Sequence, residues 1–153
     1  MTPSNYPALL NKLKKFCSDR ERCRRDVTLK IQRLRAEEFS EKLIEDLEKA
    51  DFLNENRYIR LFIHSKIQSR RWGRIKVKAN LMAKGFSSDK ILKNFNLIEK
   101  EPYKGNLRNI LTKKYESLKN AGKDNLFARL MRFGIGRGYE QELVMDIVNE
   151  KLK

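Results

Sequence analysis

The chain has 153 residues and a formal net charge of +15 at pH 7, and it is 40% hydrophobic and 36% charged. The hydrophobic share is too high for a disordered chain, and no stretch approaches the roughly 18 consecutive apolar residues of a membrane-spanning helix. With two cysteines, one histidine and no CxxC spacing, the chain lacks the ligands of a zinc site, and no metal or cofactor is expected.

Three helices are predicted within residues 8–53. Pro7 opens the first, a capping box of Ser18 and Glu21 is expected to start the second, and Ser40 is expected to cap the third. Each helix carries one apolar stripe. The stripes are Leu9, Leu10, Leu13, Phe16 and Cys17, then Cys23, Val27, Ile31 and Leu34, and then Leu43, Ile44, Leu47 and Ala50.

Three more helices are predicted within residues 54–101. Asn54 and Ser87 are expected to cap the first and the third, and Gly73 marks the break before the second. Gly85 is placed to end the second helix in the left-handed conformation that glycine adopts easily. The apolar stripes are Tyr58, Ile59, Phe62, Ile63 and Ile67, then Val77 and Leu81, and then Ile91, Leu92, Phe95 and Ile98.

The last three helices are predicted within residues 102–153. Pro102 starts the first of them, and Gly122 separates it from the second. No segment of the chain alternates apolar and polar residues with a period of two, so the predicted fold class is all-α.

The layout indicates an internal repeat of about 45 to 50 residues. Gly85-Phe86 in the second set falls opposite Gly138-Tyr139 in the third, whereas Arg35-Ala36 takes this place in the first. A three-helix unit has too small a core to be stable alone. We therefore expect three tandem repeats, 8–53, 54–101 and 102–153, stacked into an elongated, curved body.

The middle of the chain is strongly basic. Residues 56–88 carry nine Lys and Arg and no Asp or Glu. Helix surfaces usually mix both signs, so a run of this kind is typical of a surface that meets a polyanion; an ordinary exposed face of a basic protein is the alternative. Trp72 within the run fits either a core anchor or a stacking contact. The predicted nucleic-acid- or partner-binding residues are Arg57, Arg60, Lys66, Arg70, Arg71, Trp72, Arg74, Lys76, Lys78 and Lys84.

No catalytic site is recognisable. His64 stands alone on an apolar helix, and no set of nucleophile, histidine and acid accompanies it. The segment Gly134-Ile135-Gly136-Arg137-Gly138 lacks the Lys-Ser/Thr pair of a phosphate-binding loop and no strand precedes it, so a helix end is expected there. The first 15 residues lack the pattern of a secretory signal, which predicts a cytoplasmic protein with reduced Cys17 and Cys23.

Three segments of the middle set resemble the RecX family of recombinase regulators. They are Phe52-Leu53-Asn54-Glu55-Asn56-Arg57-Tyr58, Trp72-Gly73-Arg74-Ile75-Lys76 and Leu81-Met82-Ala83-Lys84-Gly85-Phe86. The sequence departs from the family pattern at Asn54, where an acid is usual, and at Ile59, where alanine is usual. The resemblance covers nearly the whole chain.

The resemblance implies a non-enzymatic, cytoplasmic protein of three tandem three-helix repeats that binds the RecA filament on DNA and modulates, usually inhibits, its ATPase and strand exchange. We expect it to be a monomer. From the residues alone, two alternatives remain. One is a stand-alone helical module whose Arg70–Lys78 segment contacts backbone phosphates. The other is a repeat scaffold for an acidic protein. If the basic run is only a solvated face, the next place to look is the surface of Arg129, Arg132 and Arg137.

Overall fold

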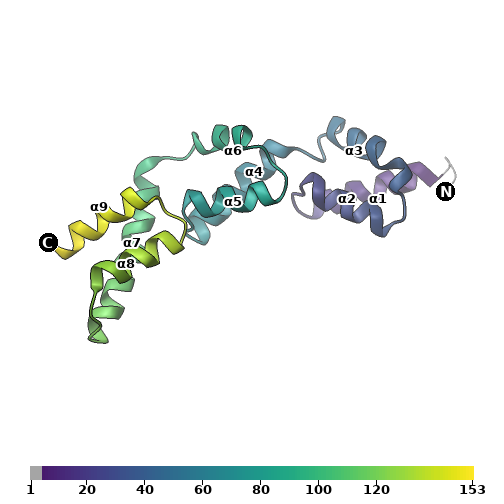
Figure 1. The fold of residues 1–153 in the computed structure, drawn as a ribbon. Coiled ribbons are helices and arrows are strands. Elements are labelled where there is room, and N and C mark those ends of the chain that lie inside the picture. Colours follow the sequence, from purple (N-terminus) through teal and green to yellow (C-terminus); the bar gives the residue numbers. More distant parts are fainter. Residues whose placement is uncertain (1–4) are drawn as a thin grey trace. The chain divides into compact units, whose positions relative to one another are not determined.

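The computed structural model describes residues 5–153, and every regular element in that range is a helix, which confirms the all-α fold class (Figure 1). Most helices lie where the apolar stripes predict them. In chain order they are α1 (Tyr6–Asp19), α2 (Arg24–Arg33), η2 (Glu37–Phe39), α3 (Ser40–Lys49), α4 (Glu55–His64), η3 (Ser65–Ser69), α5 (Arg74–Ala83), α6 (Ser88–Phe95), α7 (Lys100–Asn120), α8 (Leu126–Gly136) and α9 (Gln141–Leu152).

The chain divides into two compact units, residues 1–60 and residues 61–153. The first unit has a core built from α1, α2 and α3, where the predicted stripes meet. Tyr6 closes one side of it: the ring packs edge-on against Phe39, and the hydroxyl donates a hydrogen bond to the Asp46 carboxylate. The fully or nearly fully buried side chains are Leu9, Leu13, Cys17, Val27, Ile31, Ala36, Leu43, Ile44, Leu47 and Leu53.

The second unit holds α5 to α9, and its main core lies where α7, α8 and α9 pack on one another (Figure 1). Two stacked tyrosine rings, Tyr103 and Tyr139, are fully buried in this core, with their centroids 5.0 Å apart. The aliphatic part consists of Leu107, Leu111, Leu118, Leu130, Met131, Val144, Ile147 and Val148. The division into domains at 8–53, 54–101 and 102–153 stays a prediction.

The ends of α2, α5 and α8 share one hydrogen-bond pattern. After α5, the Gly85 N–H donates to the Met82 carbonyl at 3.0 Å, and the Phe86 N–H donates to the Leu81 carbonyl at 3.3 Å. The corresponding bonds form after α2 and after α8, and in all three places the chain turns through a left-handed residue. That residue is Arg35 after α2 (φ 55°), Gly85 after α5 (φ 97°) and Gly138 after α8 (φ 96°). The backbone therefore repeats even where Arg35 replaces the glycine.

Gly85→Val is expected to lower the free energy of unfolding by about 1–2 kcal/mol, and Gly85→Asn by less. A Cβ on Gly85 would meet no atom within 4 Å, so the whole cost comes from the left-handed backbone, which asparagine tolerates better than valine. Chemical unfolding followed by the fluorescence of Trp72, the one tryptophan, measures both variants. Equal losses for valine and asparagine would contradict this account.

Candidate functional site

The ten residues predicted to bind a partner differ in the contacts that their side chains make. The structure places them in four sets, each with different neighbours. The sets are Arg57 and Arg60 on α4, then Lys66, Trp72, Lys76 and Lys84 around one aromatic cluster, then Arg70 and Arg71 in the turn before α5, and lastly Arg74 and Lys78 along one side of α5.

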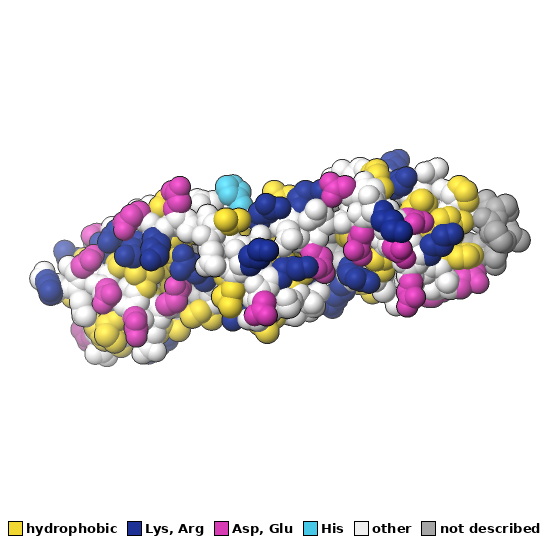
Figure 2. Space-filling model, turned by 90° about the horizontal axis from the view of Figure 1, so that it is seen from above, with side chains coloured by type: hydrophobic (Ala, Val, Ile, Leu, Met, Phe, Trp, Pro, Cys, Tyr) yellow, Lys and Arg dark blue, Asp and Glu magenta, His cyan; other side chains and the backbone are white. Residues whose placement is uncertain are grey.

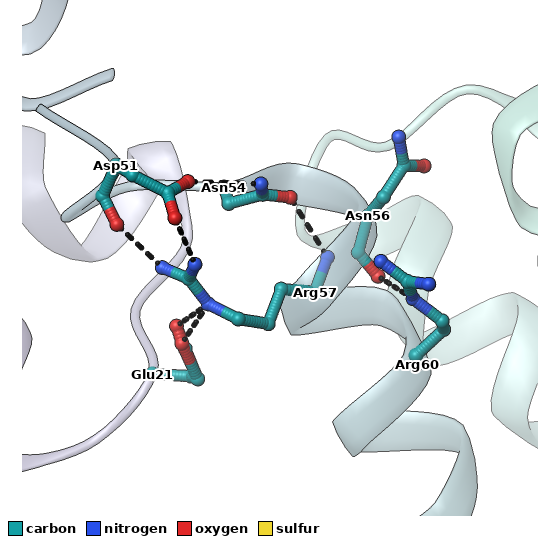
Figure 3. Close-up of polar contacts among 6 residues, drawn as sticks. All are labelled: Glu21, Asp51, Asn54, Asn56, Arg57 and Arg60. Atoms are coloured by element: carbon teal, nitrogen blue, oxygen red, sulfur yellow. Dashed lines mark hydrogen bonds and ion pairs between the residues drawn. The ribbon is translucent and has the colours of Figure 1, made fainter. Parts of the chain in front are cut away.

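The Arg57 guanidinium is held by two carboxylates of the first unit (Figure 3). Its Nε lies 2.5 Å from Glu21 Oε1, and one Nη lies 3.0 Å from Asp51 Oδ2. The Glu21 carboxylate, which accepts a hydrogen bond from this guanidinium, raises the pKa of Arg57. Arg60 is exposed and donates only to the backbone carbonyl of Asn56 at 3.3 Å. Arg57 thus serves first to hold its own unit together.

The same network explains the start of α4. The Asn54 side-chain oxygen accepts a hydrogen bond from the Arg57 backbone N–H at 2.9 Å, which confirms the predicted cap. An amide oxygen is the acceptor here, in place of the carboxylate that is usual at this position. The Asn54 amide also donates to Asp51, at 3.2 Å. This hydrogen bond, followed by the one from Arg57, lowers the pKa of the Asp51 carboxyl.

The predicted capping box of Ser18 and Glu21 is wrong. Ser18 lies in the last turn of α1, where its hydroxyl donates to the Lys14 carbonyl at 2.8 Å. The helix-start pattern forms five residues later: Cys23 is the N-cap of α2, and its N–H donates to the Asp26 carboxylate at 3.1 Å. Glu21 is consequently free to pair with Arg57, a contact 36 residues apart in sequence.

Arg57→Ala and Glu21→Ala are expected to show a coupling free energy of about 1 kcal/mol in a double-mutant cycle. The Arg57 side chain is 34% exposed and the Glu21 side chain 21%, so solvent screens the pair only in part. Urea unfolding followed by the NMR peak intensities of residues 5–60 isolates the first unit. A coupling near zero would show that the pair adds no stability.

Five half-buried side chains of the second unit form a basic aromatic patch, which we call the Trp72 cluster: Phe62, Lys66, Trp72, Lys76 and Lys84. The indole lies between two ammonium groups, with Lys66 Nζ 5.0 Å and Lys76 Nζ 4.3 Å from its centre. Lys66 and Lys84 reach the Phe62 ring in the same way, at 5.3 and 5.8 Å. None of these three lysines pairs with a carboxylate anywhere in residues 5–153.

Local backbone geometry assembles this cluster. After α4 the helix widens into the π-helical turn η3, and the Trp72 N–H then donates to the Lys66 carbonyl at 2.9 Å. This bond brings Trp72 back against the turn that carries Lys66. Gly73 follows as the N-cap of α5, so Lys76 projects from the first turns of that helix toward the same ring. The cluster unites four of the ten predicted residues.

The turn of Arg70 and Arg71 is fastened through its carbonyl groups. The Arg137 guanidinium donates to the Arg70 carbonyl, and the Tyr139 hydroxyl donates to the Arg71 carbonyl at 3.0 Å. Burial raises the pKa of Tyr139 to about 12, so this hydroxyl keeps its proton at neutral pH. The Arg70 side chain is exposed and the Arg71 side chain is half-buried. Arg137, the alternative binding residue, is therefore partly engaged within the fold.

The start of α5 lies directly against the turn between α8 and α9. The Gly73 N–H donates to the Arg137 carbonyl at 2.8 Å, and the Ile75 N–H donates to the Gly138 carbonyl at 3.0 Å. Between them, the Arg74 N–H donates to the Tyr103 hydroxyl at 2.9 Å. The first N–H groups of a helix usually lack partners, and here three of them find acceptors from other elements.

Arg74 belongs to this junction rather than to an open basic surface. Its guanidinium lies 4.3 Å from the centre of the Tyr103 ring and 3.6 Å from Glu140 Oε2. The Tyr103 hydroxyl donates to the other oxygen of Glu140. Burial, then the hydrogen bond to Glu140, raises the pKa of Tyr103 well above its ordinary value. Sequence reasoning missed this network, because Tyr103 and Glu140 are distant in the chain.

His64, the one histidine of the chain, is exposed (Figure 2). Lys and Arg side chains are spread over the whole face seen in Figure 2, interspersed with acids. Cys17 and Cys23 are both buried and are not joined in a disulfide. The predicted helix end near Gly134 is confirmed, because α8 stops at Gly136.

Residues 5–153 show neither a metal-binding cluster nor a membrane-spanning helix. No group of three or more His, Cys, Asp and Glu is close enough together to hold a metal ion. No helix in this range has the length and apolar character needed to cross a membrane.

Comparison with known proteins gives one consistent result. The family model described as the second three-helix domain of RecX matches residues 54–92. A regulatory protein RecX of Clostridium tetani is 34% identical over 114 residues, covering 73% of this chain and 52% of the relative. The RecX of Clostridium beijerinckii is 31% identical over 124 residues, covering 77% of this chain and 57% of the relative.

The fold has a close match among solved structures. The crystal structure of RecX from Lactobacillus salivarius superimposes with a TM-score of 0.87 over 97% of both chains. At 17% sequence identity this match concerns the fold alone. The chain spans about half the length of the curated Clostridium relatives, which are 52% and 57% covered.

Proposed function

The chain belongs to the RecX family of regulatory proteins, and from this premise we propose that it binds the RecA filament on DNA and inhibits it. It acts as a monomer in the cytoplasm, without catalysis of its own, and lowers both the ATPase and the strand-exchange activity of the recombinase. Within this proposal, the Trp72 cluster contacts the nucleic acid of the filament.

The Trp72 cluster is the observation that supports the nucleic-acid contact. Its three lysines carry positive charge that no described carboxylate neutralises, so a phosphate backbone meets no internal competitor. The half-buried indole and Phe62 ring offer apolar faces between those charges. Ammonium groups interleaved with aromatic rings are the combination that single-stranded nucleic acids bind, through phosphates and base stacking.

The second candidate function is a stand-alone nucleic-acid-binding module that acts through Arg70–Lys78. The same cluster favours it, because Trp72 and Lys76 lie within that segment and need no recombinase to meet phosphates. The two functions differ in the protein concentration at which the recombinase is inhibited, relative to the concentration at which bare DNA is bound. A filament regulator acts at concentrations where it barely binds bare DNA, and a simple DNA binder does not.

The test measures two quantities over one concentration series. RecA is assembled on circular single-stranded DNA, and its ATPase rate and the filament length by electron microscopy are recorded as the protein is added. Retention of the same DNA by the protein alone is recorded in the same buffer at several salt concentrations. Inhibition at concentrations well below those that retain DNA supports the filament regulator.

Two outcomes reject the proposal. Inhibition that follows DNA retention concentration by concentration assigns the effect to the stand-alone DNA-binding module. If the protein shows neither inhibition nor salt-dependent DNA retention, the remaining hypothesis is a scaffold for an acidic protein.

A further inference from the structure

A groove of about 330 Å³ lies along α5 on the second unit, beside the junction of Arg74 and Glu140. Helices α5 and α6 and the start of α7 supply its walls. This volume is at the lower end of the about 300–1,000 Å³ of ligand pockets, enough for one large side chain rather than for a whole cofactor. Its lining includes Arg74, Ile75, Lys78, Leu92, Phe95 and Lys100.

Part of the lining of the groove is apolar and lies open to solvent. Ile75 is 56% exposed and Leu92 is 46% exposed, and both line the groove beside Phe95, which is only 7% exposed. Single exposed aliphatic residues are common on protein surfaces, but two that converge on a hollow form a patch that can be covered. An apolar side chain of a partner would bury both.

The rim of the groove is basic. Lys78 and Lys100 border it, and neither has a carboxylate partner in residues 5–153. Arg74 also lines the groove, but its charge is paired with Glu140. The one acid of the lining, Glu140, already accepts a hydrogen bond from Tyr103 and pairs with Arg74. The rim therefore has unneutralised positive charge around an apolar floor.

We propose that this groove binds a protein segment that presents one large apolar side chain flanked by carboxylates. The apolar side chain covers Ile75 and Leu92, and the carboxylates reach Lys78 and Lys100. A nucleic acid fits less well, because the accessible floor is aliphatic and lacks the exposed aromatic platform on which bases stack. The groove is separate from the Trp72 cluster, so this inference goes beyond the proposed function and does not depend on it.

The probe for the test is a capped seven-residue peptide with one phenylalanine between three acidic residues on each side. It is titrated into the isotopically labelled full-length protein, and amide chemical shifts are followed by NMR. The expected shifts concentrate on the groove residues of α5 and α6. Replacing the phenylalanine of the peptide by serine, or its acids by lysines, is expected to weaken binding about tenfold or more.

Matched variants of the protein locate the binding. Leu92→Asp and Lys78→Glu are each expected to weaken the parent peptide about tenfold. Leu97→Asp and Lys93→Glu make the same chemical changes nearby and should leave the affinity unchanged, because neither residue lines the groove. Leu92, Lys93 and Leu97 are exposed, so these three changes should not disturb the core.

Three results would overturn the proposal. The first is the absence of groove shifts at millimolar peptide. The second is equal binding of the phenylalanine and serine peptides, which would indicate charge attraction alone. The third is a single-stranded oligonucleotide that shifts the groove residues more strongly than the peptide does, which would reassign the groove to nucleic acid.

Discussion

Gly73→Ala is expected to lower the free energy of unfolding of the second unit by about 3–5 kcal/mol. A Cβ placed on Gly73 would lie 2.2 Å from both the carbonyl carbon and the oxygen of Gly138. Both groups belong to backbone, so no flexible side chain can move aside. The two backbone segments must separate, and the hydrogen bonds from Gly73 to Arg137 and from Ile75 to Gly138 are then lost.

The control for this substitution lies elsewhere in the same unit. Gly105 is inside α7, where an added Cβ would meet no atom within 4 Å. Gly105→Ala is expected to stabilise the protein by about 0.5–1 kcal/mol, because alanine favours a helix interior more than glycine. Urea unfolding followed by Trp72 fluorescence compares the two. Effects of the same sign and size would show that the contact between Gly73 and Gly138 does not matter.

The double variant Lys66→Glu/Lys76→Glu is expected to weaken single-stranded DNA binding by about two orders of magnitude at low salt. It inverts two charges of the Trp72 cluster and changes the net charge from +15 to +11. The slope of log affinity against log salt should fall by about two units. Inhibition of RecA should fall in parallel if the cluster contacts the nucleic acid of the filament.

The matched control is Lys113→Glu/Lys123→Glu, which makes the same change in net charge at two exposed positions outside the cluster. It should cost much less affinity, and both double variants should melt near the temperature of the parent. If the folded Lys66→Glu/Lys76→Glu variant binds and inhibits as the parent does, the cluster is only a solvated face. Arg129 and Arg132 on α8 are then the next candidates.

Periodicity predicts this fold well, because each helix buries a stripe that is visible in the sequence. Val77 and Leu81 on α5 are fully buried, as their four-residue spacing predicts. Some short-range caps are also readable: the Ser87 hydroxyl accepts the Lys90 N–H at 3.2 Å. The predicted Ser40 cap is wrong, because Ser40 is already the first residue of α3 and the N-cap position is Phe39, which makes no side-chain cap. The prediction for Ser18 was wrong because a serine three residues before a glutamate can also lie in the last turn of a helix, as Ser18 does in α1.

The candidate site was harder to predict, since charge alone does not reveal what a side chain already contacts. Arg57 and Arg74 counted toward the basic run, but each pairs with an acid that lies far away in the sequence. The sequence marked Gly73 as a local break, yet its need for glycine comes from the neighbouring backbone of Gly138. Only three-dimensional packing shows such pairings.

The capping of α5 by distant residues has a consequence for the order in which the protein folds during synthesis. The N–H groups of Gly73, Arg74 and Ile75 depend on acceptors at Arg137, Tyr103 and Gly138. A ribosome delivers α5 before it delivers those acceptors, so the first N–H groups of the nascent helix have only water as a partner and its first turn is expected to fray. The segment that carries Trp72 therefore reaches its final geometry only after the chain up to Gly138 has emerged.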